Sequence, residues 1–215
     1  MTVKTFSYRY AQEILQHPHY KEAYDEILEV CQNCPLPIYK NKSKSQPKLD
    51  VVQQIINTYF KIAFAQKGWE EEPAVTPDSF DDALRGDFRK NFSQNEKNIA
   101  IQIEVEMGNI ASSYRNYFKF QLSYAHKLED VAVLILSCDD LSRRVDSGVA
   151  SFEKTVREIP SAALSITVPI LVIGLDDTGV EEIDIKAREE DLEIVKGSKN
   201  KYKEAHIQLV QGLLS

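Results

Sequence analysis

Two uninterrupted apolar segments constrain the fold of this chain more than any other feature. The segments "DVAVLILSC" (130–138) and "VPILVIGLD" (168–176) show no apolar and polar alternation, which is typical of strands buried on both faces of a sheet. A third segment, "NIAIQIEVEMGN" (98–109), does alternate. Helical spacing over 110–126 and 148–159 separates the three. This order predicts an α/β fold with a central mixed β-sheet flanked by helices on both faces.

The rest of the chain is expected to complete one domain, residues 1–215, because this length supports one sizeable core. The clearest amphipathic helix covers 50–67, with Asp50 as its predicted N-cap and Gly68 as its stop. Further helical spacing covers 8–32. The proline-containing "CPLPIYKNKSKSQPK" (34–48) predicts a loop.

Several features bear on where the protein works. No apolar run approaches the roughly 18 residues of a membrane span, and "MTVKTFSYRYAQEILQ" lacks the apolar core of a signal peptide. We therefore expect a cytoplasmic protein with no membrane partner. Three cysteines, Cys31, Cys34 and Cys138, cannot form a disulfide framework in a chain of this size, which agrees with a reducing compartment. We interpret the "CQNCP" pair as structural, because further ligands at metal-binding spacing are missing.

The net charge of −7 argues against a general nucleic-acid coat protein. Lysines nevertheless gather in "YKNKSKSQPK" and again in "VKGSKNKYK". Both segments are polar and loop-like, so they fit solvated surface as well as a local basic face. The sequence leaves these two interpretations open.

The alternating segment carries Glu104 and Glu106 on one face, roughly 7 Å apart. Two like charges so placed repel each other unless a cation lies between them, and carboxylate oxygens suit Mg²⁺ or Mn²⁺. Asp87 opens the segment that returns as this strand, so a hairpin would place it beside Glu104. The alternative is a solvated acidic face on an ordinary strand.

A longer motif joins these carboxylates. Asp87, sixteen intervening residues, "EVE" at 104–106 and then "MGNIASSYR" resemble the BamHI and BglII group of type II restriction endonucleases, within the PD-(D/E)XK nuclease superfamily. The resemblance continues through "LEDVAVLILSCDDLSRRVDSGVASFE" and "PILVIGLD" and covers about residues 50–176. It implies a restriction-endonuclease-like core and a site-specific nuclease.

The resemblance also assigns roles at the site. It implies that Asp87, Glu104 and the backbone carbonyl of Val105 bind one or two Mg²⁺ ions, with Mn²⁺ able to substitute. Glu106 stands where most of the superfamily has lysine, and part of this group also has glutamate there. Glu106 would act as base or hold the attacking water. A supporting glutamate follows Trp69: counting from the tryptophan selects Glu72, which we name for this role, whereas counting back from Pro73 selects Glu71.

The substrate implied is double-stranded DNA, cut at a short palindrome to leave 5′-phosphate ends with 5′ overhangs. The residues implied to contact DNA lie on two segments: Asn109, Ala111, Ser112 and Arg115 on one, and Ser147 and Gly148 on the other. Part of the group has aspartate and arginine at the positions of Ser147 and Gly148, and these two residues read an outer G:C base pair. Their absence here predicts a palindrome with a central GATC and an outer base pair other than strict G:C. A helix N-cap and a surface arginine are the alternatives for Asn109 and Arg115.

A palindrome implies a two-fold homodimer, and the resemblance places its interface on the helices at 110–126 and 148–159. The aromatic residues there would otherwise be assigned to the core. Two other functions remain open: a structure-directed repair or recombination nuclease of the same fold, and a catalytically silent DNA-binding module.

Overall fold

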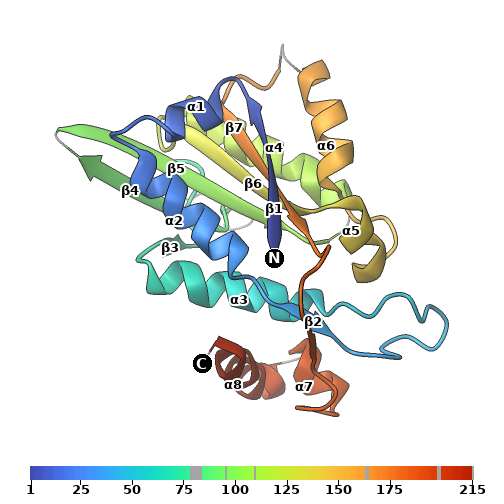
Figure 1. Cartoon of the computed structure of the whole chain (residues 1–215). Helices are drawn as coiled ribbons and strands as arrows, with labels where there is room; N and C mark the ends of the chain where they lie inside the picture. The colour runs from blue at the N-terminus through green and yellow to red at the C-terminus, as the bar shows by residue number, and fades with distance from the viewer. Residues whose placement is uncertain (78–83, 95, 109, 163–164, 198–199, 215) are drawn as a thin grey trace.

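The computed structural model describes residues 1–77, 84–94, 96–108, 110–162, 165–197 and 200–214. Its centre is a six-stranded sheet in the order β1-β7-β6-β5-β4-β3 (Figure 1). The strands are β1 (Thr2–Tyr8), β3 (Glu70–Glu71), β4 (Phe88–Gln94), β5 (Lys97–Glu106), β6 (Val131–Ser137) and β7 (Ile170–Asp176). Strands β5, β6 and β7 are parallel and the other pairings are antiparallel. The predicted mixed sheet is confirmed.

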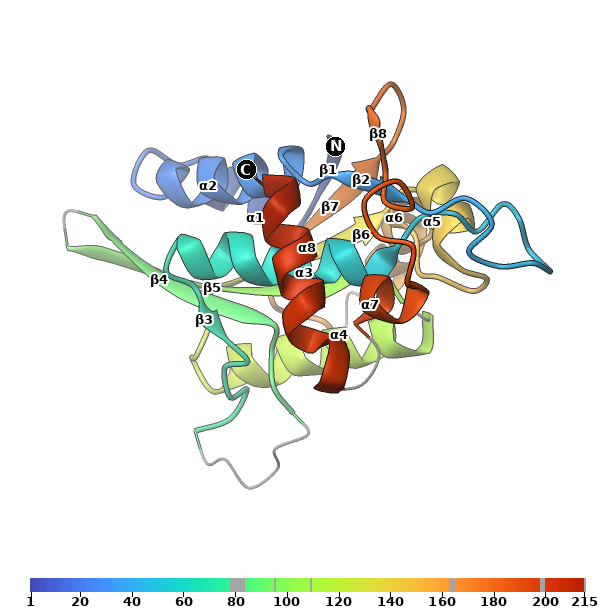
Figure 2. The ribbon, with the colours of Figure 1, turned by 90° about the horizontal axis from the view of Figure 1, so that it is seen from below.

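Helices cover both faces of the sheet, as predicted (Figures 1 and 2). One face packs on α1 (Ala11–Leu15), α2 (Lys21–Gln32) and α3 (Gln53–Gln66) through the odd-numbered side chains of β6. The other packs on α4 (Ile110–Ala125) and α6 (Phe152–Glu158) through the even-numbered ones. This alternation explains the continuous apolar sequence of β6, since both sets of side chains are buried.

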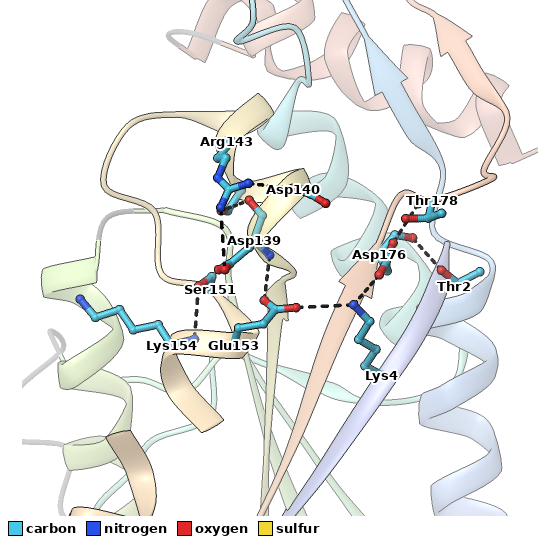
Figure 3. Close-up of polar contacts among 11 residues, drawn as sticks. Thr2, Lys4, Asp139, Asp140, Arg143, Ser151, Glu153, Lys154, Asp176 and Thr178 are labelled. Atoms are coloured by element: carbon cyan, nitrogen blue, oxygen red, sulfur yellow. Dashed lines mark hydrogen bonds and ion pairs between the residues drawn. The ribbon is translucent and has the colours of Figure 1, made fainter. Parts of the chain in front are cut away.

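The edge strand β1 was not predicted from the sequence. It pairs antiparallel with β7 over its whole length, from Thr2 opposite Asp176 to Tyr8 opposite Ile170. Only Tyr8 of the strand is fully buried, so its sequence lacks the apolar pattern of the central strands. Figure 3 shows how its side chains fasten it: Lys4 Nζ lies 2.6 Å from a carboxylate oxygen of Asp176 and 3.5 Å from one of Glu153.

Other boundaries differ from expectation for local reasons. Val52, not Asp50, is the N-cap of α3, because the Asp50 carboxylate accepts two hydrogen bonds from Arg144, each 3.0 Å long. Gly68 does end the helix, with φ of +78°. The helix expected from residue 148 begins at Phe152, where Ser151 caps it by accepting a hydrogen bond from the Lys154 N–H.

The predicted loop at 34–48 contains a short strand, β2 (Leu36–Ile38), which pairs in parallel with β8 (Glu182–Asp184). The remaining elements are α5 (Asp139–Val145), η1 (Ile159–Ala162), α7 (Leu192–Lys196), η2 (Asn200–Tyr202) and α8 (Lys203–Leu214). Among the described residues, none of the helices is both long and apolar enough to span a bilayer.

Candidate active site

The β4–β5 hairpin brings Asp87 to the middle of the predicted acidic strand. Phe88 pairs with Ile103, so the residue before Phe88 falls opposite Glu104. A carboxylate oxygen of Asp87 accepts a 2.8 Å hydrogen bond from the Val105 N–H. The hairpin that the sequence predicted therefore exists, and it places the two carboxylates together.

Glu104 is the most deeply buried acid of this group, with 1% of its surface exposed. Its Oε2 lies 2.6 Å from Lys119 Nζ. Burial, followed by the nearby Asp87 carboxylate, raises the pKa of Glu104 to about 8, although Lys119 acts in the opposite direction. Burial likewise raises the pKa of Asp87, against the Val105 hydrogen bond and the charges of Lys119 and Lys61. Burial thus has the largest effect on the pKa values of the two acids, and repulsion of Glu104 by Asp87 adds to it.

Glu106 is also buried, but its carboxylate is held toward the start of α4. Its Oε1 accepts a 2.9 Å hydrogen bond from the Gly108 N–H, and its Oε2 one of 3.3 Å from Asn116 Nδ2. Burial, and secondarily the Asp87 charge, raises the pKa of Glu106, while the hydrogen bonds from Gly108 and Asn116 lower it. Glu106 therefore shares the electrostatic environment of the site without joining Asp87 and Glu104 directly.

The two candidates for the supporting glutamate are Glu71, the last residue of β3, and Glu72, which follows it. The Glu72 N–H donates a 3.0 Å hydrogen bond to the Asp87 carbonyl, at a left-handed backbone position with φ of +52°. Both side chains turn toward Lys61 of α3, which lies 2.7 Å from Glu71 and 3.8 Å from Glu72. Glu71, Glu72, Lys61, Asp87 and Val105 all line one cavity of about 150 Å³. The structure thus brings both glutamates to the rim of the site.

Three polar side chains of α4 each bond one polar side chain of β5. The pairs are Asn116 with Glu106, Lys119 with Glu104, and Ser123 with Gln102, at 3.3, 2.6 and 2.9 Å. Positions three and four apart on a helix share a face, and so do alternate positions on a strand. We call these contacts the α4–β5 ladder. The ladder fixes α4 against the acidic strand.

Sequence reasoning missed Lys119 and Lys61 as members of the site. The polar stripe at positions 116, 119 and 123 was visible in the sequence, and it mirrors the polar positions 106, 104 and 102 of the strand in reverse order. Nothing comparable marks Lys61, which lies on an exposed position of α3. Its place at the site depends on how α3 packs against β3.

Behind the carboxylates, a polar cluster supports β5. Arg89 Nη2 donates to Gln102 Oε1 at 2.6 Å and to Ser123 Oγ at 2.8 Å. Gly86 packs against the Gln102 amide so closely that an added Cβ would lie 2.9 Å from it. Only a glycine leaves this space at the turn into Asp87, so the turn and the strand are fitted to each other.

The oxygen ligands gathered here suit a divalent cation. The Asp87 carboxylate raises the proton affinity of Glu104, and a divalent cation would relieve this repulsion. Within the described parts of the chain, three or more His, Cys, Asp or Glu side chains are nowhere placed together as a metal site. Backbone carbonyl oxygen and water would therefore have to complete the coordination. Glu104 would also have to exchange Lys119 for the ion.

The two segments that carry the residues expected to contact DNA are joined by backbone hydrogen bonds. The Gly148 carbonyl accepts a 2.9 Å hydrogen bond from the Ile110 N–H, and the Ala150 N–H donates to the Gly108 carbonyl at 3.2 Å. Ser147 and Gly148 are exposed beside the start of α4, and Arg115 is exposed one turn further along that helix. Asn109 lies outside the described residues, as do the side chains of Ala111 and Ser112.

Known proteins of similar sequence and structure identify the family. The sequence matches the family model of "Restriction endonuclease BglII/BglIII" over residues 3–175. The structure is similar to that of restriction endonuclease BglII complexed with a DNA 16-mer, with a TM-score of 0.64 and 21% identity over 81% of this chain and 76% of that one. It is also similar to free BglII, with a TM-score of 0.51 and 19% identity over 82% and 80% of the two chains. No curated protein matches the sequence.

The family match covers all six strands of the central sheet except Thr2, the first residue of β1, and Asp176, the last residue of β7. It includes the hairpin that carries the carboxylates. The resemblance of the motif from Asp87 to Arg115 is confirmed at the level of the family. The chain therefore belongs to the BglII/BglIII family of restriction endonucleases and is a type II, site-specific DNA nuclease.

Proposed function

We propose that this protein hydrolyses double-stranded DNA in a Mg²⁺-dependent reaction at a short palindrome. The observation that carries the proposal is the juxtaposition of Asp87 and Glu104, two confined acids whose mutual repulsion a divalent cation would remove. The proposal places Asp87, Glu104 and the Val105 carbonyl around one or two Mg²⁺ ions, with Mn²⁺ as a substitute. Bound Mg²⁺ would supply Lewis acidity and neutralise negative charge on the phosphate.

The remaining acids act on the water and on the geometry of the site. Glu106 accepts a proton from the attacking water, for which a carboxylate of raised pKa is better suited than an ordinary one. The hydrogen bonds from Gly108 and Asn116 fix its orientation. Glu72 supports Asp87 from the rim, with Glu71 as the alternative. Attack on phosphorus with departure of the 3′ oxygen leaves a 5′-phosphate and a 3′-hydroxyl.

We propose that the start of α4 and the segment 147–148 contact the DNA. Arg115 and Asn109 would bond base edges in the major groove, where arginine pairs with guanine and asparagine with adenine. Ala111, Ser112, Ser147 and Gly148 would complete this surface. The site proposed is a palindrome with central GATC, an outer pair other than strict G:C, and 5′ overhangs after cleavage.

A palindrome calls for a two-fold homodimer, and α4 offers a surface for it. Tyr114 and Phe118, one turn apart on α4, are 52% and 56% exposed. Large aromatic side chains so exposed commonly mark an interface. The proposed subunit is a single domain spanning 1–215, since Met1 and Val210 belong to the same core, and it would act in the cytoplasm.

Fragment-end sequencing tests the proposal. Unmethylated plasmid and phage DNA would be incubated with the protein and Mg²⁺, and the ends of the products sequenced. Discrete fragments ending at one palindrome are expected. Uniform degradation would instead indicate a structure-directed nuclease. Intact DNA under all conditions would indicate a silent DNA-binding module, and cleavage of GGATCC without AGATCT would overturn the proposed outer pair.

A further inference from the structure

The two lysine-rich segments of the sequence, 40–48 and the described residues 196–197 and 200–203, are held on the same side of the molecule. Strand β2 leads into the first and β8 precedes the second, and these strands pair in parallel. Tyr39 donates a 2.7 Å hydrogen bond to the Glu190 carbonyl. Arg144 binds Asp50 after the first segment and Glu182 before the second. Segments far apart in sequence are thus fastened together beside α3 (Figure 2).

Two hollows follow these segments along α3. One, of about 580 Å³, lies between α3, α7 and α8; the other, of about 410 Å³, lies between α3 and the 42–49 segment. They share Gln54 and Lys196. The larger hollow also shares Asn57, Lys61 and Glu71 with the active-site cavity. One continuous path therefore runs from the active-site cavity, across α3, to the segment that ends at Asp146.

Beyond the active-site cavity, the charge along this path is predominantly positive. Its two larger hollows are lined by the lysines Lys42, Lys61, Lys196 and Lys203, against the acids Glu71 and Asp146. Lys42 Nζ donates hydrogen bonds to the carbonyls of Val51 and Val145. Within the described residues, Lys196 and Lys203 have no ion-pair partner, although lysines elsewhere, such as Lys67 and Lys90, bind nearby acids. Such a surface is unexpected in a protein of net charge −7.

The position of Lys203 strengthens the argument. It is the first residue of α8, where a cation opposes the helix macrodipole and weakens the helix. Helix stability therefore does not explain it. Both Lys196 and Lys203 also lie beyond residue 175, where the family match ends.

We propose that this path, which we call the lysine path, binds the phosphodiester backbone of duplex DNA as the duplex leaves the cleavage site. The contacts would be ionic and independent of base sequence, because the side chains available are lysines, which bind phosphates as point charges. The inference rests on the proposed function and extends it to a DNA-binding surface outside the residues shared with the family.

The test is a salt titration of DNA binding. The intact protein and the variant K196Q/K203Q would be titrated into a fluorescent duplex of about 30 base pairs in EDTA, over a series of KCl concentrations. Each lost phosphate contact lowers the slope of log K against log salt by about 0.9, so the variant should lose nearly 2 in slope and roughly tenfold in affinity. Duplexes with and without the cleaved palindrome should lose affinity equally, and Lys203→Gln alone should lose about half of the slope change.

The matched control is K97Q/K127Q, which removes two exposed lysines, at the β4–β5 hairpin and just after α4. It should bind like the parent protein. An unchanged slope in both K196Q/K203Q and Lys203→Gln would overturn the lysine path while leaving the proposed function intact. Equal losses in the control would attribute the effect to net charge and overturn it as well. Failure of the unaltered protein to bind or cut DNA would overturn both proposals.

Discussion

Lys119 Nζ lies 2.6 Å from Glu104 Oε2, and the two side chains are 12% and 1% exposed. This is an ion pair inside the proposed metal site. The lysine supplies positive charge where the strand itself carries only acids, and it has to release Glu104 if a divalent cation binds there.

Replacing Lys119 should therefore lower Tm in the absence of metal and increase the gain in Tm that Mg²⁺ produces. In EDTA, Lys119→Met leaves a buried acid unpaired, which costs about 3 kcal/mol and lowers Tm by roughly 6 to 12 °C. Mg²⁺ should raise the Tm of this variant more than that of the parent protein, because no lysine competes for the carboxylate. Calorimetry with and without Mg²⁺ measures both, and Lys119→Arg serves as the control that retains the charge. Equal gains from Mg²⁺ in Lys119→Met and the parent protein would contradict the competition.

The pKa of Glu104 predicts how the metal-free protein responds to pH. Its folded-state pKa, about 8, lies above the ordinary value of 4.5, so the folded state holds the proton more tightly. The associated stability is complete below about pH 4.5 and is lost as pH rises toward 8. The parent protein should lose roughly 2 to 4 kcal/mol relative to Glu104→Gln over this range, at about 1.4 kcal/mol per pKa unit.

Urea unfolding in EDTA at pH 5 and pH 8 measures that difference. Asp140→Asn is the control, since the Asp140 side chain is 80% exposed, and it should follow the parent protein. If the unfolding free energies of the parent protein and Glu104→Gln changed equally between pH 5 and pH 8, the buried, proton-holding state of Glu104 would be refuted.

Asn116 predicts a shift in the pH dependence of cleavage. Its hydrogen bond to Glu106 lowers the pKa of that carboxyl, so Asn116→Leu should raise it. If Glu106 is the base, the acid limb of the single-turnover rate should move to higher pH, with activity regained there. Gln121→Leu on the same helix is the control, because Gln121 binds Thr167. A uniform loss of rate at every pH would assign Asn116 a structural role only.

The exposed aromatic pair of α4 predicts the behaviour of the dimer. The variant Y114K/F118K places two like charges on the proposed interface and should sediment as a monomer. It should also lose at least tenfold in double-strand cleavage, since each subunit cuts one strand. Tyr10→Lys, at a position that is 75% exposed, controls for loss of surface aromatic area. A parent protein that is itself monomeric on DNA would refute the two-fold arrangement.

The parts of the fold that the sequence predicted are those with local, redundant signals. Strands β6 and β7 are apolar at nearly every position because both of their faces are buried. Strand β1 lacked such a signal because it lies at the sheet edge and is held by backbone pairing and by Lys4. Asp50 was misjudged as a helix cap because its partner, Arg144, lies 94 residues away.

The active-site residues also differ in whether the sequence predicted them. Asp87 and Glu104 could be predicted from their pattern and from the family motif. Lys119 and Asn116 required knowledge of how α4 lies on β5, which spacing alone did not reveal. Lys61 required the packing of α3 against β3. Tertiary contacts of this kind leave little trace in a single sequence.

The α4–β5 ladder also bears on how such an enzyme could acquire a new target sequence. A helix turned by one residue, about 100°, would withdraw all three ladder side chains from the strand at once. The roll of α4 is therefore fixed by the same carboxylates that are proposed to cut the DNA. Mutations that tilt or rotate this helix would sacrifice turnover, so divergence of specificity should proceed by replacing outward-facing side chains. Exposed Ser147 is one place to begin, whereas Gly148, with φ of +75°, is constrained by its backbone.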